Sequence, residues 1–306
     1  MSANVQIGMV GLGEMGAGMM QRLLLAGRGP VGYNRTRAKA EPLIAGGMRW
    51  AGSPRAVIDA CDVVISMVTN DDALRAVADG PDGLLAGMKP GKTLVDMSTV
   101  APATIRELGV RVAATGGDVL DAAVLGSPLT IEQGKLLIMA GGDEAVFERT
   151  KPALLDIGPI VRRVGDIGQA KVMKIALNLN LPVQILALSE GLLLAEKSGI
   201  PRDVALEIML GGVVCSPMLA YRGPFILNMP ERAWFDVGMM QKDLNLALEL
   251  GRQVEVPLPA TSVTNEMLTA TRAAGLQDYD FAVIFHTLAR MAGVETAINR
   301  GGNAEA

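Results

Sequence analysis

The sequence predicts two domains, an α/β domain in the first half of the chain and an all-α domain in the second. Two observations lead to this prediction. Short apolar runs rich in Val and Ile alternate with helical patterns up to about residue 165, and only helical patterns follow. The length of 306 residues also suits two domains of roughly 100–200 residues each.

Four short apolar runs are predicted strands of the first domain. They are nearly continuously apolar rather than alternating, which is typical of parallel strands that helices cover on both faces. A further strand is expected at residues 31–33. The four runs are Val5–Val10, Val63–Val68, Thr93–Met97 and Leu136–Ala140, and two predicted helices between them are Met15–Ala26 and Asp71–Val77.

The second domain shows no stretch with the two-residue period of a strand. We place its start near Gly165–Gly168, where glycines and Asp166 favour a turn and a helix N-cap, and we assign residues 1–165 and 166–306 to the two domains. The predicted helices are Lys171–Gly199, Arg202–Leu210, Gly238–Arg252, Ala260–Ala274 and Asp280–Met291.

Composition excludes several classes of site. A single histidine, His286, excludes multi-histidine metal sites, and the two cysteines, Cys61 and Cys215, form no CxxC motif, so we expect no metal. Two cysteines far apart in the chain form no disulfide framework, which suits a reducing cytoplasm. The net charge is −4, with no basic block and only two Trp, three Tyr and five Phe, so we expect no nucleic-acid partner.

The mean hydropathy of +0.32 raises the question of a membrane segment. No uninterrupted apolar run approaches the ~18 residues of a membrane-spanning helix. The first 16 residues lack the basic start of a signal peptide and contain Glu14. We therefore expect a cytoplasmic protein without a membrane segment.

A glycine-rich turn follows the first predicted strand. Gly11-Leu12-Gly13-Glu14-Met15-Gly16 has the pattern GxGxxG and opens a helix. The first glycine permits the tight turn, the second lets the backbone approach a diphosphate, and the third permits close helix–strand packing. This context predicts a Rossmann dinucleotide-binding domain, with Gly11, Leu12, Gly13, Met15 and Gly16 at the cofactor. The alternative is a glycine-rich turn without a ligand.

The residues after the second strand predict which dinucleotide binds. An acidic residue there would bind the ribose 2′-hydroxyl of NAD. This chain instead has Asn34, Arg35 and Thr36, and a cation beside a hydroxyl suits a 2′-phosphate. We therefore predict NADPH. The alternative is that Arg35 and Arg37 form a solvated edge.

Hydride transfer to a carbonyl also needs a proton donor. None of the three tyrosines is followed by Lys at the fourth position, and His286 has apolar neighbours and is expected to pack in a core. Lysine remains. Lys174 lies in an apolar helical segment and shares a helix face with Asn178. Burial, with repulsion from Lys171, would lower the pKa of Lys174. The alternative is a pair of lysines that extend to the surface.

Four segments in order resemble the β-hydroxyacid dehydrogenase family, whose members include 3-hydroxyisobutyrate dehydrogenase. The nearest branch is the glyoxylate/succinic semialdehyde reductases, and the likeness covers about residues 5–293. It implies an α/β Rossmann domain with a parallel-rich sheet and helices on both faces. A long helix joins this to an all-α C-terminal domain like that of 6-phosphogluconate dehydrogenase. The segments are Gly11–Gly16, Asp121–Ser127 with its continuation to Gly134, Gly165-xx-Gly168-x-Ala170-xxx-Lys174-xxx-Asn178, and Lys242–Leu248.

The resemblance implies roles for residues of this chain. Lys174 would protonate the carbonyl oxygen during reduction, and Asn178 would hold the substrate or the lysine. Lys242 would close over the cofactor, while Thr99 and the backbone of Met67–Val68 would line the nicotinamide side. We therefore expect an NADPH-dependent oxidoreductase that reduces a small aldehyde or keto acid in a cleft between the domains. We also expect a homodimer or homotetramer.

Departures from the family pattern keep alternatives open. Leu125 stands where the family usually has Ser, so carboxylate binding would rest on the N–H groups of Gly126 and Ser127 or on the Ser127 hydroxyl. A more apolar pocket leaves reduction of cyclic imines as an alternative, although imine reductases commonly have Asp or Tyr in place of Lys174. A catalytically idle NADPH-binding scaffold is the other alternative. Pro182 predicts a kink after Asn178.

Overall fold

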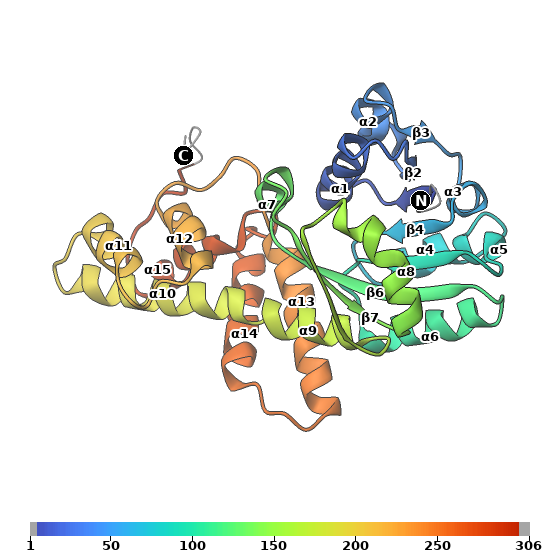
Figure 1. Cartoon of the computed structure of the whole chain (residues 1–306). Coiled ribbons are helices and arrows are strands. Elements are labelled where there is room, and N and C mark those ends of the chain that lie inside the picture. The colour runs from blue at the N-terminus through green and yellow to red at the C-terminus, as the bar shows by residue number, and fades with distance from the viewer. Residues whose placement is uncertain (1–4, 300–306) are drawn as a thin grey trace. The chain divides into compact units, whose positions relative to one another are not determined.

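The fold is described from a computed structural model, in which residues 5–299 are described. Residues 1–4, the start of the stretch tested above for a signal peptide, lie outside the described residues. Contacts between residues divide the chain into two compact units, Met1–Lys174 and Ile175–Ala306. Figure 1 shows the sheet in the first unit and helices in the second.

The first unit contains one eight-stranded sheet with the order β3-β2-β1-β4-β5-β6-β7-β8. All neighbouring strands are parallel except β6 and β7, which are antiparallel. The strands are β1 Ile7–Val10, β2 Val31–Tyr33, β3 Arg49–Trp50, β4 Val63–Ser66, β5 Thr93–Asp96, β6 Asp118–Leu125, β7 Leu137–Gly141 and β8 Ile160–Gly165. The mainly parallel sheet that we predicted is confirmed.

Helices cover both faces of this sheet. One core cluster joins side chains of α1 and α8 to the sheet, and a second joins side chains of α3, α4 and α6 to the opposite face. Burial on both faces explains why β1, β4 and β5 are mostly apolar. The helices are α1 Glu14–Leu25, η1 Arg37–Ala40, α2 Glu41–Ala45, α3 Pro54–Ala60, α4 Asp71–Ala78, α5 Leu84–Gly87, α6 Pro102–Ala113, α7 Pro128–Glu132 and α8 Glu144–Leu155.

The second unit is helical, as predicted, with its own core of buried apolar residues. Arg222 and Asp280 form an ion pair of 3.2 Å inside this core, and the side chains are 3% and 0% exposed. The elements are α10 Asn180–Lys197, α11 Arg202–Gly211, α12 Pro217–Arg222, η2 Gly223–Ile226, α13 Val237–Gln253, α14 Pro259–Ala273, η3 Phe281–Val283 and α15 Ile284–Met291.

Helix α9, Gln169–Asn178, contains the division between the units. We placed the domain boundary at 165/166, whereas contacts place it after Lys174, because Lys171 at the start of α9 is buried in the first unit. The predicted single helix is interrupted at Leu179, although its φ of −59° and ψ of −28° remain helical. Pro182 has no N–H to offer the Asn178 carbonyl, which accounts for an interruption at this position.

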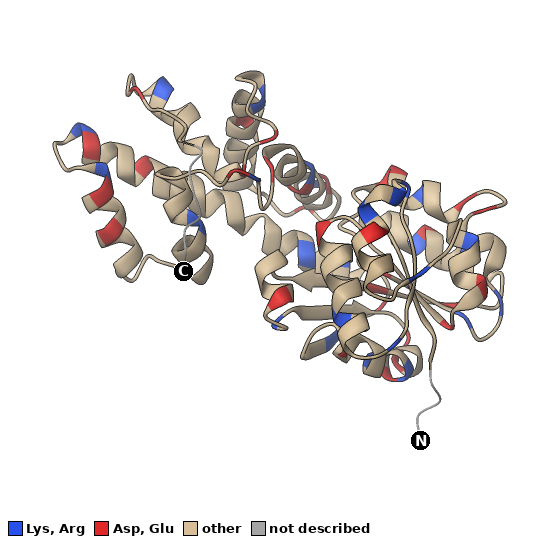
Figure 2. Ribbon diagram, turned by 90° about the horizontal axis from the view of Figure 1, so that it is seen from above, with Lys and Arg blue, Asp and Glu red and all other residues tan. Residues whose placement is uncertain are grey.

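The joined stretch Gln169–Lys197 is long and apolar enough, by length and composition alone, to cross a membrane. A buried helix in the core of a water-soluble protein passes the same test, so one such stretch is weak evidence for a membrane. Here Ile185, Leu192 and Leu193 of this stretch pack inside the core of the helical unit. In the view of Figure 2, acidic and basic residues are interspersed along both units.

Candidate active site

The glycine-rich turn has the backbone that a dinucleotide site requires. Gly11 has a φ of +95°, and a Cβ there would clash with the carbonyl oxygen of Met67. A Cβ on Gly16 would clash with the carbonyl oxygen of Gly11. Gly13 is different, because a Cβ there would meet no atom within 4 Å, and Gly13 N-caps α1 without a side-chain acceptor. Open backbone at a helix N-terminus fits a bound diphosphate.

Asn34 holds this turn in place. Its Oδ1 accepts a hydrogen bond of 3.0 Å from the Leu12 N–H, and its Nδ2 donates one of 2.8 Å to the Thr36 carbonyl. Both ends of the Asn34 amide therefore bind backbone. We predicted Asn34 and Leu12 as cofactor contacts, and the structure gives Asn34 the further task of fixing the phosphate turn to the end of β2.

The two arginines after β2 differ in their surroundings. Arg37 lies 3.1 Å from Glu41 and its guanidinium lies over the ring of Trp50 at 5.4 Å from the centroid. Arg35 is exposed beside Asn34 and Thr36. Arg35 is therefore the better placed of the two to meet a group that approaches the end of β2.

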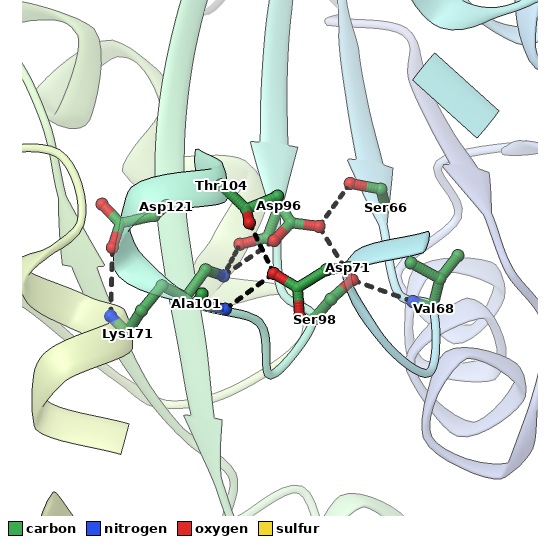
Figure 3. A network of polar contacts seen from close by, with 9 residues as sticks. All are labelled: Ser66, Val68, Asp71, Asp96, Ser98, Ala101, Thr104, Asp121 and Lys171. Atoms are coloured by element: carbon green, nitrogen blue, oxygen red, sulfur yellow. Dashed lines mark hydrogen bonds and ion pairs between the residues drawn. The ribbon is translucent and has the colours of Figure 1, made fainter. Parts of the chain in front are cut away.

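A row of buried polar side chains crosses the sheet at the carboxyl ends of β4 and β5 and continues into the middle of β6. The strand register aligns Ser66 of β4 with Asp96 of β5, and Asp96 with Asp121 of β6. All three are fully buried. Asp96 Oδ1 accepts hydrogen bonds from Ser66 Oγ at 2.7 Å and from Ser98 Oγ at 2.8 Å (Figure 3). Ligands of parallel sheets bind beyond such strand ends.

Lys171 completes this row. Its Nζ lies 2.8 Å from Asp96 Oδ2 and donates a hydrogen bond of 2.7 Å to the Asp96 carbonyl. The backbone N–H of Lys171 donates to Asp121 Oδ2 at 3.1 Å (Figure 3). Our expectation of a buried Lys174 was wrong, because Lys171 is the fully buried lysine and Lys174 is half-buried. The charge of Lys171 is also balanced by Asp96 rather than left to repel Lys174.

The loops after β4 and β5 are fastened to each other. The Val68 N–H donates to Ser98 Oγ at 2.9 Å. On the other side, Asp71 Oδ1 accepts from the Ala101 N–H at 3.0 Å and from Thr104 Oγ1 at 2.5 Å (Figure 3). The residues predicted for the nicotinamide side, Met67, Val68 and Thr99, lie on these two loops.

Asn178 and Lys242 both contact Asp243, within the helical unit. Asn178 Nδ2 donates to Asp243 Oδ2 at 2.5 Å, and Lys242 Nζ lies 2.8 Å from Asp243 Oδ1. Asn178 and Asp243 are buried. Asn178 Oδ1 is buried without a hydrogen-bond partner among residues 5–299, so this oxygen remains able to accept a proton donor. Asp243 was not predicted as a site residue, although it lies within the segment Lys242–Leu248.

The predicted substrate segment begins as a strand rather than a loop, since Asp121–Leu125 belong to β6. Leu125 is 36% exposed at the strand end. Gly126 has a φ of +151°, and a Cβ there would lie 2.7 Å from the Leu136 side chain. Ser127 Oγ N-caps α7 through the Thr130 N–H at 3.3 Å and contacts the Thr130 hydroxyl at 3.1 Å. Capping uses a lone pair of the hydroxyl oxygen, so the hydroxyl hydrogen and the backbone N–H groups both stay possible anion donors.

His286 is packed, as predicted. It is buried, and its Nδ1 lies 2.8 Å from Thr296 Oγ1. Burial, and after it the charge of Arg202, lowers the pKa of His286 to about 4. At neutral pH the imidazole is therefore uncharged. Ala170 has a negative φ, since Glu255 is the sole non-glycine residue with a positive φ among the described residues.

The missed site residues carried a partial signal. Ser66 and Asp96 end the adjacent strands β4 and β5 and lie near the ends of the predicted runs, and polar residues at parallel strand ends point to a ligand site. Lys171 and Lys174 lie within one turn of a helix whose apolar pattern does not distinguish them, so the sequence left open which one faces the sheet.

Comparisons with known proteins agree with this geometry. Residues 6–165 match the family model for the NAD binding domain of 6-phosphogluconate dehydrogenase. Residues 168–288 match the model described as NAD-binding of NADP-dependent 3-hydroxyisobutyrate dehydrogenase. The two matches meet close to the start of α9.

Individual relatives cover most of the chain. Glyoxylate/succinic semialdehyde reductase 1 of Arabidopsis thaliana is 34% identical over 93% of this chain and 98% of its own. 2-(Hydroxymethyl)glutarate dehydrogenase of Eubacterium barkeri is 33% identical over 97% and 99%. The crystal structure of a 3-hydroxyisobutyrate dehydrogenase from Salmonella typhimurium has a TM-score of 0.83, with 30% identity over 92% and 99%.

The fold and the phosphate turn define a nicotinamide-dependent oxidoreductase with a Rossmann domain and a helical C-terminal domain. The chain belongs to the β-hydroxyacid dehydrogenase family and resembles 3-hydroxyisobutyrate dehydrogenase. Its cofactor is a nicotinamide dinucleotide, and the open backbone at Gly13 fits the diphosphate of that group.

Replacing Gly13 with Ala tests the phosphate turn. The added methyl group meets no protein atom within 4 Å, so we expect Tm to change by no more than about 2 °C. The methyl would stand where the diphosphate approaches, so Kd for NADPH should rise at least about tenfold, or ~1.4 kcal/mol. Calorimetric titration measures this. Gly211→Ala is the control, since Gly211 has equally open space on α11. An unchanged Kd in Gly13→Ala would contradict the assignment.

Proposed function

We propose that this protein is an NADPH-dependent reductase that converts a small aldehyde or keto acid to the hydroxy compound, in a reversible reaction. The observation that supports it most is the combination of the open phosphate turn at Gly13 with Lys174. Lys174 lies on α9, three residues after the buried Lys171. Reduced nicotinamide supplies the hydride when bound. The chain's own residues must bind the cofactor and carbonyl and supply the proton.

The preference for NADPH rests on the end of β2. No acidic side chain stands at residues 34–36, where a carboxylate would accept from a ribose 2′-hydroxyl. Asn34 is committed to the phosphate turn, which leaves the exposed Arg35 and Thr36 as partners for a 2′-phosphate. A guanidinium and a phosphate form charge-assisted hydrogen bonds.

Removing each arginine in turn tests this preference. Arg35→Gln should lower the ratio of kcat/KM for NADPH to that for NADH by about 10- to 100-fold, since a hydrogen bond to a charged group contributes about 1.5–3 kcal/mol. Arg37→Gln is the matched control and should change the ratio little, because Arg37 is engaged by Glu41 and Trp50. Equal ratios in the wild type and both variants would indicate that Arg35 and Arg37 are only solvated and do not contact a 2′-phosphate.

Lys174 is proposed as the general acid for reduction and the general base for oxidation. An ammonium group can donate a proton to the carbonyl oxygen as negative charge develops there. Asn178 Oδ1, which has an open acceptor position, would hold the reacting hydroxyl or the lysine. Asp243 orients the Asn178 amide and pairs with Lys242, so these three residues are proposed to act together.

Lys174→Ala tests the acid–base role. With the best substrate, kcat should fall by about 10²–10⁴-fold, which is the usual contribution of a positioned acid. Kd for NADPH should stay within about threefold. Lys174→Arg should not restore activity, because a guanidinium does not give up its proton in proteins. Lys89→Ala, at an exposed lysine before β5, is the control. Near-normal turnover by Lys174→Ala would refute the assignment.

Leu125 shapes the proposed substrate range. It is an exposed apolar side chain at the end of β6, followed by the Gly126 turn, and the Ser127 hydroxyl is engaged as an N-cap. Carboxylate binding would then depend on the Gly126 and Ser127 N–H groups or on the hydrogen of the Ser127 hydroxyl. This arrangement favours small aldehydes over strongly acidic substrates.

A screen of NADPH oxidation over aldehydes, keto acids and cyclic imines tests the substrate class. Leu125→Ser should raise kcat/KM for semialdehyde acids by about tenfold, the gain of one hydrogen bond to a charged group, and leave neutral aldehydes unchanged. No gain would show that the backbone N–H groups suffice. Faster reduction of imines than of every carbonyl would make the protein an imine reductase. NADPH binding without any turnover would make it an idle scaffold.

We also propose a homodimer or homotetramer in the cytoplasm. Exposed apolar side chains cluster on α10, α11 and the following loop, and a second copy of the chain would cover them; they are Leu194, Val204, Ile208, Val213 and Val214. Light scattering of the purified protein measures its mass, and a monomer would refute the assembly. Cys61 and Cys215 are free thiols, which suits a reducing compartment.

A further inference from the structure

We propose that Lys171 is a positioning residue for hydride transfer. Through Asp96 it fixes the start of α9, which carries Lys174, relative to the two loops assigned to the nicotinamide side. This inference rests on the proposed function, because it concerns the same reaction. Lys171 itself lies too deep to touch substrate, since its side chain is fully buried.

The Asp96 side chain joins three segments of the first unit. Oδ2 lies 2.8 Å from Lys171 Nζ on α9, and Oδ1 accepts from Ser66 of β4 and from Ser98 after β5 (Figure 3). Lys171 Nζ also donates to the Asp96 carbonyl at 2.7 Å, so the ammonium holds both the side chain and the backbone of Asp96. Fully buried lysines are rare unless they are paired in this way.

A chain of hydrogen bonds connects this ion pair to the loop after β4. The Ser98 hydroxyl donates its hydrogen to Asp96 Oδ1. This orientation points the lone pairs of Ser98 Oγ toward the Val68 N–H, which donates a hydrogen bond of 2.9 Å to Ser98 Oγ. The orientation of the Ser98 hydroxyl therefore depends on a correctly placed Asp96 carboxylate. The backbone at Val68 depends in turn on Ser98.

A second contact fixes the helix itself. Asp121 Oδ2 accepts from the Lys171 N–H, at the third residue of α9, where a negative charge is favourable at a helix N-terminus. Lys171 is therefore held through its backbone by β6 and through its side chain by β5. Lys174 follows less than one turn later, so its place relative to the Val68 loop depends on these contacts.

A double substitution separates positioning from stability. Lys171→Met alone would leave Asp96 charged and unpaired in the interior, and this variant can fail to fold. Lys171→Met with Asp96→Asn removes both charges and nearly preserves side-chain size. The matched control is Arg222→Met with Asp280→Asn, which removes a buried ion pair from the core of the helical unit.

Kinetics give the first measurement. In the Lys171/Asp96 double variant, kcat should fall at least tenfold while KM for NADPH stays within about threefold, because the turn at Gly11–Gly16 is untouched. The primary isotope effect on kcat with NADPH deuterated at the transferred hydrogen should rise, since a misplaced hydride donor slows the chemical step. The Arg222/Asp280 variant should keep the wild-type kcat and isotope effect per folded molecule. Wild-type values of both in the Lys171/Asp96 variant would overturn the proposal.

Hydrogen–deuterium exchange gives a measurement that needs no turnover. Amides in peptides covering residues 67–70, 97–101 and 169–174 should exchange at least tenfold faster in the Lys171/Asp96 variant than in the wild type. In the Arg222/Asp280 control variant, their exchange rates should equal those of the wild type. Unchanged exchange would overturn the positioning role. If the wild type turns over no substrate, but the Lys171/Asp96 variant still exchanges faster than the wild type in these peptides, the proposed function fails while the positioning of the loops stands.

Discussion

The ion pair between Lys171 and Asp96 is the interaction on which the arrangement of the first unit's catalytic end depends. Parallel strands leave their carboxyl ends at one edge of a sheet, where loops must be held without further ladder bonds. Here one carboxylate receives an ammonium and two hydroxyls from three separate segments. Burial makes these charge-assisted contacts both strong and costly to break, so they constrain geometry as well as stability.

The helical unit uses the same device with different residues. Asp243 receives the Asn178 amide and the Lys242 ammonium, and the orientation of Asn178 leaves its oxygen open. A buried aspartate therefore acts in each unit. Asp243 contacts Asn178, which is proposed to touch the reactants, whereas Asp96 acts through Lys171 and Ser98 on neighbouring segments. The aspartates do not take part in proton transfer in this proposal, and their task is to restrict the rotamers of their neighbours.

Much of the fold was predictable because burial leaves a trace in the sequence. Strands β1, β4, β5 and β7 are covered on both faces and were recognised as apolar runs. Strand β8 was missed because most of its residues are exposed, and β6 because its segment was assigned to a substrate loop. Helix α12 was missed because six residues are too few for a helical period to be recognised.

The sequence by itself determined the phosphate turn, the absence of an acidic residue after β2, the helical second half and the family, because each depends on local residue order or on periodicity. Only the tertiary structure decided which lysine is buried. Lys171 and Lys174 have the same local pattern, and their difference arises from Asp96 and Asp121 on strands 50 to 75 residues away in the chain. Partners that far apart meet only after the sheet has formed, so no local pattern encodes their contact.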